Sequence, residues 1–213
     1  MACAICHIRK PRRFCPGVRG DICTICCGTE REVTVDCPWD CPYLQEARKH
    51  ERSAPVDPDG FPNQDIRVSE DFLRDHEPLL VATARGLMQA AFDTAGAVDL
   101  DVREALDALI RTYRTLQSGV YYETRPDNAL ANRIRRDTQS AIEEYRGHES
   151  ERPGMPRSRD SEVLTTLVFL QRMELDRYNG RPRGKAFLDF LRSFFGVEDD
   201  AAAVASASSL ILP

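Results

Sequence analysis

All eight cysteines of this 213-residue chain lie between Cys3 and Cys41, and none follows. Such a density is typical of a small module held together by metal ions or disulfides, whereas the remainder has the composition of an ordinary soluble domain. The polar and basic residues His7–Lys10 interrupt any apolar signal core, so we expect a cytoplasmic chain. Cytosolic reductants keep thiols reduced, and the cysteines therefore indicate metal ligands more than disulfides.

The spacing of the cysteines predicts two metal ions. Two of the intervals are Cys-x2-Cys, a spacing that lets the chain turn so that both sulfurs reach one ion. Four thiolates at about 2.3 Å satisfy tetrahedral Zn²⁺, and such a closed site has no open position for water or substrate. We therefore expect two structural zinc ions and no catalytic metal. The predicted ligands are Cys3, Cys6, Cys15, Cys23, Cys26, Cys27, Cys37 and Cys41.

Two ligand assignments remain open. The first gives one ion Cys3, Cys6, Cys23 and Cys26, and gives the other ion Cys15, Cys27, Cys37 and Cys41. The second uses His50 as a ligand and leaves Cys26 or Cys27 free. We favour the first because it needs no leftover thiol. An iron–sulfur cluster is a weaker alternative: Cys-Pro occurs three times, but the run of three cysteines each two residues apart is missing.

Local patterns within the module predict its secondary structure. Residues 31–36 alternate as a strand does, and Gly17 and Gly20 suit a turn before Asp21. Cys41 occupies an N-cap position with proline after it, which predicts a helix over residues 43–52. A thiolate at a helix N-terminus is favoured by the helix dipole.

Residues 1–52 contain three cysteine motifs, which are Cys-Ala-Ile-Cys, Ile-Cys-Thr-Ile-Cys-Cys-Gly and Asp-Cys-Pro-Trp-Asp-Cys-Pro-Tyr-Leu. A knuckle, a hairpin and a ligand-bearing helix in this order resemble treble-clef zinc fingers. The ligand count for two ions resembles the cross-brace fingers of the B-box, MYND and HIT kinds. The motif string also looks like a group of uncharacterised bacterial zinc-binding proteins, and this resemblance implies no activity. The adjacent Cys26 and Cys27 fit none of these finger spacings.

The rest of the chain has a helical pattern. We expect a linker over 53–68, an α-helical domain over 69–196 and a disordered tail over 197–213. Caps and periodicity predict helices that start near Ser69, Pro78, Asp101 and Asp127, a buried helix over Asp160–Tyr178, and a last helix that ends at Gly196. The predicted fold class is thus a small zinc-stapled finger, with a short β-hairpin and a helix, followed by an all-α helical bundle.

Charge limits the partners that the chain can have. Its 29 Lys and Arg against 34 Asp and Glu give a net charge of −5, which excludes an overall basic coat for nucleic acid. Two basic patches remain as possible nucleic-acid or anion sites. The first comprises Arg9, Lys10, Arg12, Arg13 and Arg19. The second comprises Arg177, Arg181, Arg183 and Lys185.

Signals for an enzyme are poor. The chain has four histidines and contains no metalloprotease, P-loop or nucleophile-elbow motif. No apolar run approaches the roughly 20 residues of a membrane helix. We expect a non-enzymatic zinc protein that binds another protein as an adaptor, with nucleic-acid binding through the two basic patches as the alternative. We expect Trp39, between two ligands, to cover a metal site or contact a partner.

Overall fold

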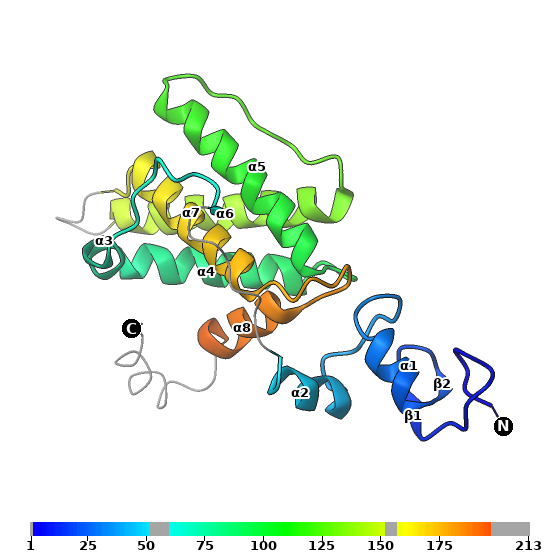
Figure 1. The fold of residues 1–213 in the computed structure, drawn as a ribbon. Helices are drawn as coiled ribbons and strands as arrows, with labels where there is room; N and C mark the ends of the chain where they lie inside the picture. Colours follow the sequence, from blue (N-terminus) through cyan, green and yellow to red (C-terminus); the bar gives the residue numbers. More distant parts are fainter. Residues whose placement is uncertain (1, 52–59, 152–156, 197–213) are drawn as a thin grey trace.

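The computed structural model describes residues 2–51, 60–151 and 157–196, so the predicted tail and residues 53–59 of the predicted linker lie outside the described residues (Figure 1). A short hairpin near the N-terminus is followed by a mostly helical chain. The helical part contains α3 (Glu70–Asp75), α4 (Glu77–Phe92), α5 (Asp99–Gln117), α6 (Ala129–Glu151), α7 (Asp160–Arg177) and α8 (Ala186–Phe195).

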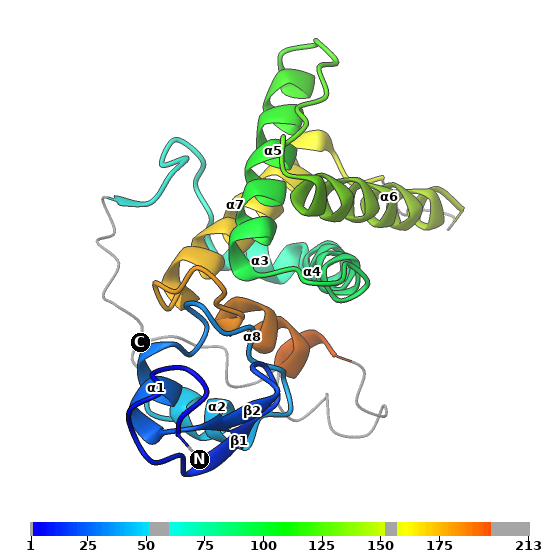
Figure 2. The same ribbon diagram turned by 90° about the vertical axis from the view of Figure 1, so that its right-hand side faces the viewer.

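The long helices pack on one another in the manner of a helical bundle. Helix α4 contacts α6 and α7, while α5 contacts α6 and α7. Helix α8 contacts α4, α5 and α7 and lies at the end of the bundle next to the N-terminal module, as Figures 1 and 2 both show. Gly86 of α4 permits the close crossing with α6, because a Cβ there would lie 2.5 Å from that of Ala141.

The buried side chains confirm the prediction that α7 is a buried helix, because it is buried along most of its length. In α5, Tyr113 is completely buried. Phe187 of α8 is also completely buried, whereas Phe194 of the same helix is 51% exposed. Side chains from α4 to α8 thus form one continuous apolar core.

The predicted helix starts are partly right. Ser69 caps α3 by accepting a hydrogen bond from the Phe72 amide, as expected. The start predicted at Asp101 is wrong by two residues, because α5 begins at Asp99 and Asp101 accepts instead from the Val98 amide. The start predicted at Asp127 is wrong in the opposite direction, because α6 begins two residues later, at Ala129. There the side chain of Asn128 accepts from the Leu130 and Ala131 amides at the start of α6.

Asp99 ties the start of α5 to the start of α8. Its buried carboxylate accepts hydrogen bonds from the amides of Phe187 and Leu188, at 3.0 and 3.1 Å. Burial raises the pKa of Asp99 to about 7, even though these two hydrogen bonds favour the ionised form. The positive end of α8 is therefore filled by a side chain of this chain.

The N-terminal module contains two short strands and two short helices. Strands β1 (Arg13–Cys15) and β2 (Gly20–Ile22) form an antiparallel hairpin, followed by α1 (Thr24–Thr29) and α2 (Pro42–Arg48). Cys41 is the N-cap of α2 with proline after it, as predicted, but the helix ends at Arg48 and not at the predicted residue 52. The strand predicted over 31–36 is wrong: these residues form a turn with a single bridge, because Glu32 takes a positive φ of 53°.

The segment before α3 is held against the helices. Asn63, at a φ of 58°, donates to Gln171 and accepts from Arg114, and Arg172 donates to the carbonyls of Asn63 and Ile66. Within the described part of the chain, no helix is both long enough and apolar enough to cross a membrane.

Candidate metal centre

Four cysteines from two distant stretches of sequence come together in the N-terminal module. Cys3 and Cys6 lie on the first turn of the chain, and Cys23 and Cys26 lie at the start of α1. Two backbone hydrogen bonds hold the first turn. The Cys3 amide donates to the Arg9 carbonyl and closes the turn, and the Ala4 amide donates to the Asp21 carbonyl and connects the turn to β2. The hairpin therefore positions one Cys-x2-Cys pair opposite the other.

The four sulfur atoms of this group all lie within 4.8 Å of one another. In tetrahedral Zn²⁺ coordination at 2.3 Å, the sulfurs would be about 3.8 Å apart, so a small contraction would close such a site. Three of the four residues are buried and Cys6 is half-buried. All eight cysteines of the chain are free thiols. The group can therefore offer four sulfur ligands to a metal ion.

Backbone amides surround the sulfurs. The Cys23 amide donates to the sulfur of Cys3 at 3.2 Å, and the Cys26 amide donates to the sulfur of Cys23 at 3.4 Å. Burial tends to raise the pKa of Cys3, but hydrogen bonds from the amides of Cys6, Cys23 and Ile5 lower it to about 6. Burial and the neighbouring thiols raise the pKa of Cys26 to about 12. One thiolate forms easily and hinders the next, as expected where like charges share a site.

The other four cysteines, Cys15, Cys27, Cys37 and Cys41, line a small cavity of about 20 Å³ together with Cys26 of the first group and with apolar and basic side chains. This volume matches one ion or water molecule. Arg13 and Arg31 donate to the sulfur of Cys27 at 3.7 and 3.9 Å. Burial raises the pKa of Cys37, and the nearby Cys41 and Cys15 add to this effect. Among the described residues, only the first group meets the 4.8 Å spacing.

The adjacent Cys26 and Cys27 differ in their surroundings, since consecutive residues of an α-helix point about 100° apart. Cys26 belongs to the first group and also lines the cavity, whereas Cys27 lines the cavity and does not belong to the first group. His50, the alternative ligand, is exposed and lies 3.4 Å from Glu46. It belongs neither to the first group nor to the residues that line the cavity.

The first basic patch is largely exposed. Arg9, Lys10, Arg12 and Arg19 are all exposed, and so are Ile8 and Phe14 beside them. Arg13 differs because its guanidinium lies over the Tyr43 ring, 3.8 Å from the centroid, and donates to Cys27. The patch therefore contains one fewer exposed cation than the sequence pattern suggests.

The second basic patch is mostly engaged within the chain. Lys185 is 6% exposed and pairs with Asp36 at 2.7 Å, and Arg181 pairs with Glu51 at 3.1 Å. Arg177 lies over the Phe190 ring and pairs with the neighbouring Asp176. Only the side chain of Arg183 is exposed and without a partner among the described residues.

Two residues of the module have roles that the sequence does not indicate. Glu32 is completely buried and contacts the turn between α7 and α8, and Trp39 stacks on Phe92 of α4 with 5.0 Å between ring centroids. The only sequence signal was a tryptophan between two ligands. It indicated a contact, but not that the contact is with the helices of the same chain.

Comparison with known proteins adds no assignment. No family model, curated protein or solved structure matches the chain.

Proposed function

We propose that this protein binds two structural zinc ions through its eight cysteines and acts without catalysis, as an adaptor that recognises another protein. The observation that carries the proposal is the group of four sulfurs within 4.8 Å of one another. Four thiolates complete the tetrahedral coordination of Zn²⁺, so an ion held there has no position for a substrate. Its contribution is to folding, because the module has only a small apolar core of its own.

The second ion is proposed for the cavity. Its four cysteines include residues from the hairpin, from α1 and from the N-cap of α2, so one ion would join three elements that few backbone contacts connect. The two nearby guanidiniums, of Arg13 and Arg31, would offset part of the negative charge of a four-thiolate site. This arrangement supports the all-cysteine assignment over the one that uses His50.

The adaptor role is supported by the exposed apolar residues of the module. Ile8 is 85% exposed, Phe14 61% and Ile25 52%. Large apolar side chains held rigidly at a surface are the kind of group that anchors protein–protein contacts.

Metal analysis of the purified chain tests the zinc proposal. We expect about two zinc ions per chain and a colourless solution, and removal of zinc by a chelator should unfold the module while the helical circular dichroism persists. A brown protein that contains iron and sulfide would contradict the proposal, and so would a chain that folds without metal.

Nucleic-acid binding is the second candidate, favoured by the exposure of the first basic patch. Lys10, Arg12 and Arg19 form no ion pair with any residue that the structure describes, and Phe14 is available to stack on a base. The second patch gives less support, since most of its cations are engaged.

A salt titration with single-stranded DNA distinguishes the two candidates. If nucleic acid is the partner, replacing Arg12 and Arg19 together by alanine should reduce the salt dependence, by about 0.7 in log–log slope for each phosphate that the variant no longer neutralises. The control replaces Arg67 and Arg85, two exposed arginines away from the module, which changes the net charge equally. No affinity at low salt, or equal effects of both double variants, would remove this candidate.

A further inference from the structure

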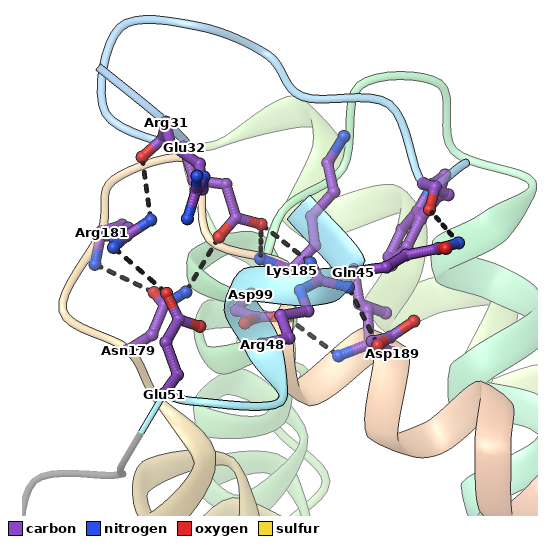
Figure 3. A network of polar contacts seen from close by, with 12 residues as sticks. Arg31, Glu32, Gln45, Arg48, Glu51, Asp99, Asn179, Arg181, Lys185 and Asp189 are labelled. Carbon is purple, nitrogen blue, oxygen red and sulfur yellow. Dashed lines mark hydrogen bonds and ion pairs between the residues drawn. The ribbon is translucent and has the colours of Figure 1, made fainter. Parts of the chain in front are cut away.

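The N-terminal module is docked on the turn between α7 and α8 through a buried carboxylate. Figure 3 shows Glu32 at the centre of this contact. One oxygen of its carboxylate accepts from Arg48 at 2.8 Å and from the Lys185 amide at 3.2 Å, and the other accepts from the Asn179 side chain at 3.0 Å. The carbonyl of Glu32 accepts from the Arg183 amide at 2.8 Å. A buried carboxylate is stable only when it is satisfied in this way.

Ion pairs surround this carboxylate. Arg181 pairs with Glu51 and also donates to the carbonyl of Arg31 (Figure 3). Lys185 pairs with Asp36. Arg48 of α2 pairs with Asp189 of α8 at 3.0 Å. Each of these contacts connects the module to the helical part, and two cations of the second basic patch, Arg181 and Lys185, are neutralised by acids of the module.

Trp39 adds an apolar contact to the same interface. Besides stacking on Phe92, its ring has Lys185 and Arg192 within 5.3 and 5.2 Å of its centroid. It packs against the core of the helical part rather than that of the module. Trp39 is also the only tryptophan of the chain, so its fluorescence reports on this interface alone.

The residues that dock lie between the cysteines of the cavity. Glu32 lies midway between Cys27 and Cys37, and Trp39 lies midway between Cys37 and Cys41. Arg48 follows from Cys41 along α2. A metal ion that binds these three cysteines would fix both ends of each loop that carries a docking residue, and so would restrict the loops to the docked geometry.

From this arrangement we infer that metal binding at the cavity and docking of the module on the α7–α8 turn are thermodynamically coupled. Each event stabilises the other, so the ion at the cavity keeps Arg181 and Lys185 of the second basic patch covered. Release of this ion favours an undocked module and uncovers Arg181 and Lys185. The inference rests on the proposed second zinc ion, and it adds that this ion controls the docking of the module on the helical part.

The test is Asn179→Asp in the full chain. This variant keeps the side-chain oxygen that accepts from the Arg181 amide and places a negative charge 3.0 Å from the Glu32 carboxylate. It lies outside the module and far in sequence from every cysteine. We expect the affinity for the second zinc ion, measured by chelator competition, to fall by roughly 5- to 150-fold, because coupling is reciprocal. We also expect red-shifted Trp39 emission with both ions bound.

The control is Asp176→Asn, which changes an exposed carboxylate of α7 that, among the described residues, pairs with Arg177 alone. Its zinc affinities and Trp39 emission should equal those of the wild type. Comparison of the wild type with Cys27→Ser identifies the zinc ion of the cavity, because this variant should lack that ion. If the wild type binds two ions and Asn179→Asp binds the second ion with the same affinity, the coupling is wrong and the proposed function stands. A wild type that binds fewer than two ions overturns the proposed function, and the coupling with it.

Discussion

Cys26→Ser should leave the chain with about one zinc ion in place of two, and the ion lost should be that of the first group. Serine lacks the thiolate that Zn²⁺ binds, and the three remaining sulfurs leave one position open to water. Because a structural zinc ion contributes much of the folding free energy of a small finger, the hairpin and first turn should unfold. Zinc analysis and limited proteolysis of the first 30 residues measure the two effects.

Cys27→Ser is the matched variant, since it makes the same chemical change one residue further along α1. It should also lose one ion, but the first turn and hairpin should keep their protection from protease, because Cys27 faces the cavity. The double variant should bind no zinc. If both single variants lose the same ion, or if the double variant retains one, then the assignment of Cys26 and Cys27 to different ions is wrong.

Phe187→Ala should strongly destabilise the helical part. The ring is completely buried where α8 packs on the bundle, and the amide of the same residue donates a hydrogen bond to the Asp99 carboxylate. Removal of a buried phenylalanine costs about 3–5 kcal/mol of the free energy of unfolding. Each kcal/mol lowers Tm by about 2–4 °C in a chain of this size. Thermal unfolding followed by circular dichroism at the helical band measures this loss.

Phe194→Ala is the control for this prediction, because it makes the same truncation on the same helix at a side chain that is 51% exposed. Its Tm should change by less than about a quarter of the change for Phe187→Ala. Equal losses of stability in the two variants would mean that α8 does not bury the face that the structure describes.

Local signals were sufficient for much of the fold. The many apolar residues of α7 predicted that this helix is buried, and the hydroxyl of Ser69 and the proline after Cys41 marked two helix starts. The spacing of the cysteines was sufficient for the first group, because a Cys-x2-Cys turn fixes two sulfurs locally and the pair at the start of α1 completes the set. These features depend on residues close in sequence.

Features that depend on distant residues were not predicted. The alternation of residues 31–36 suggested a strand, but Glu32 turns inward at a positive φ because partners 147 to 153 residues later satisfy its carboxylate. The contact of Trp39 with Phe92 of α4 was also not predicted, because the two rings lie 53 residues apart in the sequence. Basic residues at 181 and 185 resembled an anion site because the acids that neutralise them lie far earlier in the chain.

The 147 residues between Glu32 and Asn179 also set an order of events during synthesis. Ribosomes add about 5–20 residues per second, so the module exists for roughly 7 to 30 s before its docking partner has been made. Throughout that interval Glu32 lacks its partners on the α7–α8 turn, whereas Phe92, the ring that Trp39 contacts, is made earlier. The nascent module must therefore either take up its metal unaided or leave the cavity to be filled when the last helices arrive.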